Sequence, residues 1–385
     1  MKNMFKALAC AMVASAVLTA CGGGDGGSTP TGTLHVAMTD APSCGFDHVY
    51  VTVSQVRVHA SANAGDNDAG WSTVSLPAPQ KIDLLSLTNG TLADLGQTAL
   101  PAGQYQQVRL VLVPNQGNAL SNSVVPSNTG VEQQLATPSA TQSGYKIISP
   151  FTVQPNTLVD LVLDFNACKS IVQRGNGTYS LKPVVTATPT VVSGQISGYV
   201  AQAEAGATVY AEQGGKVVRG TVADGSGKFV LSPLIQSSTQ GNYDVVIVQN
   251  GVSSGIVRSV PVVVNSNTAV STSNVPIALP ASAMSAVSGT VTPSAAALVR
   301  ALQTVDANAY EITSVNANLD NGAYVLSVPK AAPIVGTYNG TLPVALAAVP
   351  AAAGRYTIEA DPASGTPQAV SVNATTDQSN VNFSF

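Results

Sequence analysis

Short apolar stretches alternate with turn-forming residues over most of the 385-residue chain. Within many stretches every second residue is apolar, which is typical of β-strands with one buried face. The clearest examples are 33–42, 48–60, 103–113 and 145–165, the last of which is divided into two strands at Pro155–Asn156. Many short strands bounded by Gly, Pro, Asn and Asp predict an all-β fold built from sandwiches.

The strand at 48–60 contains a change of phase. The apolar residues before the change are Val49, Val51 and Val53, and those after it, on the opposite parity, are Val56 and Val58. A β-bulge near Ser54–Gln55 would return both sets to the same core face. A short helical turn is expected only within residues 81–96.

The second half of the chain contains an internal repeat. VSGQISGYV at 192–200 matches VSGTV at 287–291, DGSGKFVLSPL at 224–234 matches DNGAYVLSVP at 320–329, and GNYDVVIVQ at 241–249 matches GRYTIEADP at 354–362. A period of about 95 residues fits one small sandwich per copy, and not a solenoid repeat. We therefore predict three tandem β-sandwich domains at 33–188, 189–281 and 285–385, with the Ala- and Pro-rich insertion 331–353 as a loop.

Two family resemblances follow from these motifs. Residues 33–188 resemble the domain of unknown function 4382, common in bacterial lipoproteins, through MTDAP, IDLLSL, LPAGQYQQVRLVL, LVLDFNACKSIV and YSLKPVV. That resemblance implies no activity, because none is established for the family. The two repeats resemble carboxypeptidase regulatory-like (prealbumin-like) modules, with a leading SG-x-V strand, an Asp-Gly or Asn-Gly hairpin and a G-x-Y strand. Relatives of such modules often accompany glycan-active proteins.

The first residues have the features of an export signal. Lys2 and Lys6 precede a short apolar stretch, too short to span a bilayer, and small residues follow it. Leu18–Thr19–Ala20–Cys21 is similar to a bacterial lipobox, which implies cleavage after residue 20 and acylation of Cys21. Residues 21–32 would form a flexible tether. Gly22 after the cysteine implies by resemblance the outer membrane, facing the periplasm or the cell surface.

Charge and composition narrow the set of partners. Only 9% of the residues are charged, and without Lys2 and Lys6 the basic residues fall from 16 to 14 against 20 acidic ones, a net charge of −6. No block of Lys or Arg alternates with aromatic residues, so nucleic-acid binding is not expected. We also expect no cofactor.

The cysteines that remain after processing are Cys44 and Cys168. An even pair in an oxidising compartment predicts a disulfide between them. A nucleophilic Cys168 would need a histidine partner, and all histidines lie far from it in sequence.

Asp40 and Asp164 each end an apolar strand, and a cysteine follows each of them four residues later. The disulfide would bring both strand ends to one rim, where Lys169 and Lys182 would be ion-pair partners. Three interpretations are open for these carboxylates: turn capping through Asx hydrogen bonds, Ca²⁺ binding with backbone carbonyls, and an acid–base pair. Turn capping is favoured by the local sequences TDAP and DFNA.

Other motif matches are better explained as turns. GVSSG at 251–255 fits the nucleophile-elbow pattern, but no histidine follows residue 59 to complete a triad. DGSGKF at 224–229 lacks the spacing of a phosphate loop. His35, His48 and His59 lack metal-ligand spacing, and would hold a metal only if their strands met.

We therefore expect a non-catalytic, membrane-anchored lipoprotein that acts as a binding or structural module. The alternative is a carbohydrate- or peptidoglycan-binding protein using residues 189–385, and a hydrolase using Asp40 and Asp164 is the least favoured reading. The expected partners are membrane lipid through acylated Cys21, and a glycan or an envelope protein.

Overall fold

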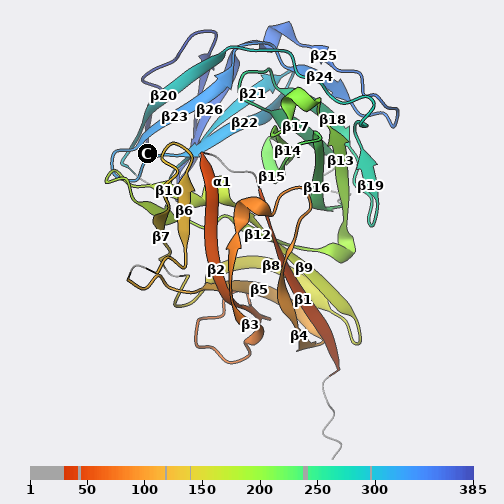
Figure 1. Ribbon diagram of the computed structural model, residues 1–385, viewed down its shortest axis with the longest axis vertical. Coiled ribbons are helices and arrows are strands. Elements are labelled where there is room, and N and C mark those ends of the chain that lie inside the picture. Colours follow the sequence, from red (N-terminus) through yellow and green to blue (C-terminus); the bar gives the residue numbers. More distant parts are fainter. Residues whose placement is uncertain (1–29, 42–44, 118, 139, 237–241, 295–296) are drawn as a thin grey trace, which may run out of the picture.

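The computed structural model describes residues 30–41, 45–117, 119–138, 140–236, 242–294 and 297–385. Its regular elements are almost all strands, and the one α-helix in these ranges, α1 (Ala167–Ser170), is a single turn. The predicted all-β class is therefore confirmed. Figure 1 shows the N-terminal domain, in red to yellow, below two further β-domains in green and blue. No helix in the described ranges is long and apolar enough to cross a bilayer.

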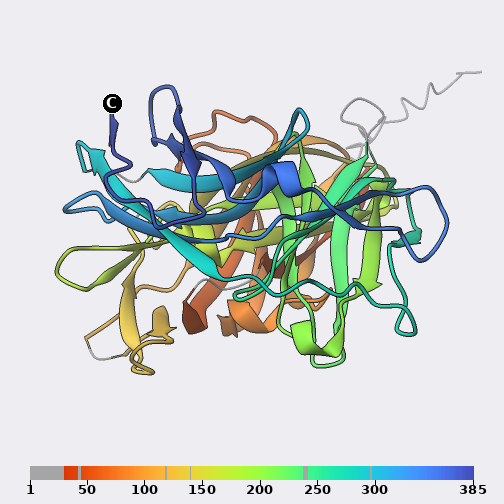
Figure 2. The same cartoon turned by 90° about the horizontal axis from the view of Figure 1, so that it is seen from above.

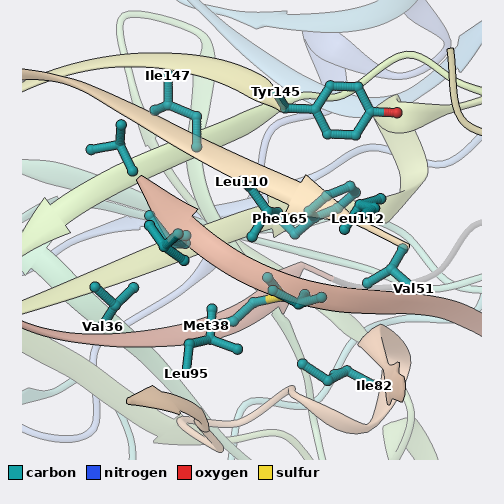
Figure 3. Close-up of a cluster of buried hydrophobic side chains, with 14 of the residues drawn as sticks. Val36, Met38, Val51, Ile82, Leu95, Leu110, Leu112, Tyr145, Ile147 and Phe165 are labelled. Atoms are coloured by element: carbon teal, nitrogen blue, oxygen red, sulfur yellow. The ribbon is translucent and has the colours of Figure 1, made fainter. Parts of the chain in front are cut away.

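The N-terminal domain packs a four-stranded sheet, in the order β12-β9-β1-β4, against an eight-stranded sheet, in the order β10-β11-β7-β6-β2-β5-β8 with β3 paired to β2. Its elements are β1 (Thr31–Ala41), β2 (Phe46–His59), β3 (Ser72–Asp83), the 3-10 turn η1 (Leu84–Ser86), β4 (Ala93–Pro101), β5 (Gly103–Leu112), β6 (Ser123–Pro126), β7 (Gln133–Ala136), β8 (Tyr145–Val153), β9 (Leu158–Asn166), α1, β10 (Ile171–Gln173), β11 (Tyr179–Leu181) and β12 (Val185–Pro189). The core lies between the two sheets, and Figure 3 shows Met38, Leu110 and Phe165 meeting there.

The bulge predicted in the second strand is confirmed. The register of β2 shifts between Val53 and Gln55 against β3 and against β5. All of the valines on either side of the shift are fully buried, namely Val49, Val51, Val53, Val56 and Val58. The extra residue thus keeps both apolar sets on one face. The predicted helical turn is η1, and the predicted break at Pro155–Asn156 separates β8 from β9.

The two C-terminal domains repeat one topology. The second has sheets β16-β13-β19 and β15-β14-β17-β18, and the third has β23-β20-β28 and β22-β21-β26-β27. In both, the last segment pairs parallel with the first strand, and the four-stranded sheet is antiparallel. The elements of the second domain are η2 (Thr190–Val192), β13 (Ser193–Tyr199), η3 (Gln202–Glu204), β14 (Thr208–Gln213), β15 (Lys216–Val222), β16 (Lys228–Ile235), β17 (Tyr243–Val248), β18 (Gly255–Val260) and β19 (Asn267–Ala269). Those of the third are β20 (Met284–Thr292), β21 (Leu298–Val305), β22 (Asn308–Asn316), β23 (Ala323–Pro329), β24 (Ile334–Thr337), β25 (Ala347–Ala348), η4 (Pro350–Ala352), β26 (Arg355–Asp361), β27 (Gln368–Asn373) and β28 (Phe383–Ser384).

The insertion in the third domain, predicted to be a loop, is part of the second domain's sheet. β24 pairs parallel with β18, and β25 continues the sheet beyond it. Ile334 and Val344 from this insertion are buried in the hydrophobic cluster of the second domain. The loop prediction was wrong because the partner strand, β18, lies far away in the sequence.

The middle of the second domain's sheet, at residues 245–248 of β17, is apolar on both faces. Val245 and Ile247 of β17 face their own core, whereas Val246 between them and Ile256 of β18 belong to the cluster of the third domain. A strand buried on both sides has no polar face, which explains the continuous apolar run VVIV at 245–248. Figure 2 shows the green and blue domains next to each other.

Candidate functional site at the domain junction

The predicted rim carboxylates, Asp40 and Asp164, lie at the ends of neighbouring parallel strands. The register of β1 and β9 places Thr39 opposite Asp164 and Asp40 opposite Phe165. Because successive side chains point to opposite faces of a sheet, Asp40 shares the core face with Phe165 and Asp164 lies on the outer face. The structure therefore does not bring the two carboxylates together as a cation-binding or acid–base pair.

Asp40 and Asn166 hold the turn after β9. Asp40 Oδ1 accepts a hydrogen bond from Ala167 N at 3.0 Å. Asn166 is the N-cap of α1, and its Oδ1 accepts a hydrogen bond from Lys169 N at 3.0 Å. Asp40 thus holds a turn that is distant in sequence, and this contact differs from the local Asx hydrogen bond within TDAP that the turn-capping interpretation predicts.

Asp164 joins the first domain to the second. Its Oδ1 lies 2.6 Å from Nη1 of Arg219 on β15, and the two side chains are only 6% and 3% exposed. Arg219 also donates through Nε and Nη2 to the carbonyl of Pro233, at 3.3 and 3.2 Å. Burial raises the pKa of Asp164, and the Arg219 charge offsets that rise only in part. The sequence suggested Lys169 or Lys182 as the partner of this acid, whereas the structure gives it Arg219.

Lys169 instead joins the first domain to the third. Its Nζ lies 2.7 Å from Glu311 Oε1 on β22, and the second oxygen of Glu311 accepts a hydrogen bond from Arg300 Nη1 at 3.1 Å. Arg300 also forms an ion pair with Glu359 and donates to the carbonyl of Gly215 in the second domain, at 3.2 Å. Lys169, Glu311 and Arg300 thus form a connected series of ion pairs and hydrogen bonds that reaches all three domains.

Glu212 of β14 completes this arrangement and is fully buried. Its Oε2 accepts a hydrogen bond from the backbone N of Glu311 at 3.1 Å. Burial, together with the nearby Glu311 charge, raises the pKa of Glu212 well above its usual range. A neutral Glu212 fits the charge balance around it, since the ion pairs here join three cations to three anions.

We name the six residues Asp164, Lys169, Glu212, Arg219, Arg300 and Glu311 the junction cluster. A cleft of about 210 Å³ lies beside it and is also lined by Lys216 and Asp361. Sequence reasoning selected only Asp164 and Lys169 of this set. The remaining four are charged side chains inside largely apolar strands of a chain that is 9% charged, and that position was the signal available for them.

The structure separates the histidines. His35 contacts Asp160 through Nδ1 at 2.7 Å and Asp94 through Nε2 at 3.1 Å. His48 contacts Asp83 at 2.7 Å, and Nε2 of His59 lies 3.0 Å from the Ala69 carbonyl. Among the described residues no three His, Cys, Asp or Glu side chains form a group that could hold a metal ion.

The two rejected motifs lie in turns. GVSSG connects the antiparallel strands β17 and β18 as a hairpin. In DGSGKF, Asp224 Oδ1 accepts hydrogen bonds from Ser226 N at 2.8 Å and Lys228 N at 3.1 Å, which closes the loop before β16.

The lipidation and disulfide predictions involve Cys21 and Cys44, which lie outside the described residues. Cys168 is in α1. The register that places Ala41 opposite Asn166 sets the ends of β1 and β9 side by side just before both predicted disulfide positions. The bridge stays a prediction that this register supports.

The fold and the junction cluster together define a protein of tandem β-sandwich domains that are joined by buried ion pairs. Residues 31–183 match the family model of a Domain of unknown function (DUF4382), in agreement with the resemblance found for residues 33–188. No curated protein matches the chain. The likeness of the two later domains to prealbumin-like modules stays a prediction.

Solved structures with some likeness include two type II cohesin–X-dockerin complexes from Acetivibrio cellulolyticus, an N-terminal and a C-terminal interface mutant. They are 26% and 24% identical to this chain over 23% of it, with TM-scores of 0.19 and 0.18, and the match spans 58% of each of those chains. The pilus adhesin SpaC from Lactobacillus rhamnosus GG is 8% identical over 90% of this chain and 38% of its own, with a TM-score of 0.13. TM-scores this low do not indicate a shared overall fold.

Proposed function

We propose that the protein is a non-catalytic binding or structural module of the bacterial envelope, anchored to the outer membrane through acylated Cys21. The observation that carries this proposal is the junction cluster, which joins all three domains through buried charges. Domains in one chain ordinarily move relative to one another unless their interface is large and apolar. Here the second and third domains share hydrophobic clusters, and buried ion pairs join the first domain to both of them.

The same contacts argue against catalysis at the predicted rim. Asp164 is engaged by Arg219 and Lys169 by Glu311, each across a domain boundary. Removing one partner of such a buried pair costs several kcal/mol, so these groups are committed to holding the domains. A hydrolytic activity of the purified protein that is lost on Asp40→Asn or Asp164→Asn would overturn this part of the proposal.

The direction of β1 supports a role in presenting the C-terminal domains. The Ala41 end of β1 lies at the junction, and the Thr31 end, next to the proposed tether, lies at the far end of the N-terminal domain (Figure 1). At a rise of about 3.3 Å per residue, β1 separates the two ends by roughly 33 Å. An anchor before residue 30 therefore places the second and third domains away from the membrane.

Glycan binding by residues 189–385, the alternative function, finds little support in the aromatic residues. Every tyrosine in that range is buried or half-buried. Trp71, the one tryptophan, has the guanidinium groups of Arg57 and Arg109 at 4.5 and 5.0 Å from its ring centre. Sugar recognition usually needs an open aromatic face, and no tyrosine of residues 189–385 offers one; Phe385, which is 40% exposed, is an exposed aromatic side chain in that range.

Two measurements test the proposal. Cells fed an alkyne fatty acid should label the protein in the membrane fraction, and Cys21→Ala should lose the label. Spin labels at Gln104 and Val325, exposed positions of the first and third domains, should give a single narrow distance distribution. A broad distribution would show domains that move independently and would contradict the proposal, and saturable binding in a polysaccharide pull-down would favour the glycan alternative.

A further inference from the structure

The repeated topology gives the second and third domains equivalent edge strands. β18 is the outermost strand of its domain's own four-stranded sheet, and β27 has the same place in the third domain. Tyr243 pairs with Val260 across β17 and β18, and Tyr356 pairs with Val372 across β26 and β27. What covers one edge is therefore informative about the other.

The edge of the second domain is covered by a strand from outside that domain. β24 lies parallel to β18, with Gly255 opposite Ile334 and Arg258 opposite Thr337. The added segment, IVGT, carries no charge. Val257 of β18 and Ile334 are buried in the core of the second domain, and Gly255 is buried as well.

The equivalent edge of the third domain pairs only with β26 among the described strands. Five of the six residues of β27 are exposed, and Val370 is 41% exposed. Natural edge strands are normally protected by charge, proline or brevity, as β15 is by the exposed Lys216. β27 has the sequence QAVSVN and carries no charge or proline to discourage pairing.

The register shows which backbone groups of β27 are available. Ala374 N donates to Gly354 O at 2.6 Å, one pair beyond the pairing of Arg355 with Asn373. Hydrogen-bonded and non-bonded pairs alternate in an antiparallel ladder, so the N–H and C=O groups of Ala369, Ser371 and Asn373 point away from β26. These groups form a row that an added strand can use.

A cleft of about 740 Å³ adjoins the C-terminal end of this row. It is lined by Ser371, Val372 and Asn373 of β27, by Arg355 and Thr357 of β26, and by η4. In strand addition, main-chain hydrogen bonds supply affinity, and pockets for alternate side chains supply selectivity. Both requirements are present at this edge.

We propose that β27 binds an extended, uncharged segment of a partner protein as an added parallel strand, as β18 binds β24. The proposal rests on the proposed role as a binding module and names the class of partner. The occupant is a run of small and β-branched residues like Ile334–Thr337. It is not the insertion of a second copy, because each copy already uses that segment on its own β18.

The test uses the whole mature chain and a fluorescent synthetic peptide with the sequence of residues 331–340, AAPIVGTYNG, as the probe. We expect saturable binding by fluorescence anisotropy and, in hydrogen exchange, protection of the amides of Ala369 and Ser371. Ser371→Pro removes an outward N–H without touching the ladder to β26, and it should weaken binding about tenfold or more. Ser371→Ala keeps that N–H and is the matched control, with an expected change of less than about twofold.

Ala369→Lys is the second variant, since it leaves the backbone donors in place and adds the charge that protects natural edges. It should also weaken binding. The proposal is overturned by absence of saturable binding, by equal binding to Ser371→Pro and Ser371→Ala, or by protection confined to β18. Dimerisation of the chain that Ser371→Pro abolishes would overturn it as well, because the occupant would then be a second copy. Loss of peptide binding with an unchanged, narrow Gln104–Val325 distance would refute this inference alone and leave the proposed function standing.

Discussion

Replacing Arg219 by Met should strongly destabilise the protein. The change keeps most of the apolar stem and removes the cation that lies 2.6 Å from the Asp164 carboxylate. It also removes both hydrogen bonds that the Pro233 carbonyl receives from this side chain. Because Asp164 is only 5% exposed, water cannot replace the lost partner.

The magnitude follows from the burial of the pair. Removing one member of a buried ion pair typically costs about 3–5 kcal/mol, because the other charge stays buried without compensation. The exposed pair Lys81–Glu132, whose side chains are 43% and 42% exposed, is the matched control. Lys81→Met should lower the free energy of unfolding by less than about 1 kcal/mol.

The pH dependence of the loss has a definite sign. Burial already raises the pKa of Asp164, and loss of Arg219 raises it further. A carboxyl whose pKa is higher in the folded state than in the unfolded state binds a proton on folding, so its penalty applies above the raised pKa and fades as the pH falls below it. The loss in free energy of unfolding caused by Arg219→Met should therefore become smaller as the pH falls from neutral toward the ordinary pKa range of Asp.

Urea unfolding followed by Trp71 fluorescence and far-UV circular dichroism measures these effects. The double variant Asp164→Leu/Arg219→Met removes both charges, and it should recover most of the loss, so the coupling energy in the double-mutant cycle should be at least as large as the recovered part. A cost below about 1 kcal/mol for Arg219→Met would refute the reasoning, since it would make the pair equivalent to an exposed one. A double variant as unstable as the single one would refute it too.

Further predictions concern other parts of the molecule. Burial and the Glu311 charge raise the pKa of Glu212, so the stability of the native protein should fall as the pH rises through that pKa. Glu212→Gln should therefore raise the melting temperature more at pH about 8.5 than at pH about 5. An equal effect at both pH values would contradict this prediction. Ile334→Ala should cost about 2–5 kcal/mol and speed amide exchange in β18, and unchanged exchange would show that β24 does not protect that edge. Cys168→Ser should lower stability by about 2–5 kcal/mol through loss of the predicted disulfide, and mass spectrometry of the unreduced exported protein should show no free thiol at Cys44 or Cys168.

Local features of the sequence were sufficient for much of the fold. The change of parity between Val53 and Val56 located the bulge, because only an inserted residue can keep both sets in the core. The turn at Pro155–Asn156 and the repeated strand order could be predicted from the sequence for a similar reason. Each depends on periodicity or turn chemistry within a short window.

The junction cluster could not be predicted from local sequence, because its contacts depend on how the domains pack against one another. Nothing near Asp164 indicates that its partner is Arg219, and nothing near Lys169 indicates Glu311. The aspartates were expected to meet because both end strands, but one residue of register places them on opposite faces. The apolar run at 245–248 was a usable signal of two-sided burial, although it does not say which domain covers the outer face.

The contribution of Ile334 and Val344 to the core of the second domain also determines when that domain can finish folding during synthesis of the chain. A chain released only as far as residue 281 contains every strand of that domain's own sandwich, yet its β18 edge is still open and two core positions are still empty. That domain can close only after a later stretch of the message has been translated. Splitting the gene between the two repeats would leave the middle third of the product as a substrate for chaperones and proteases.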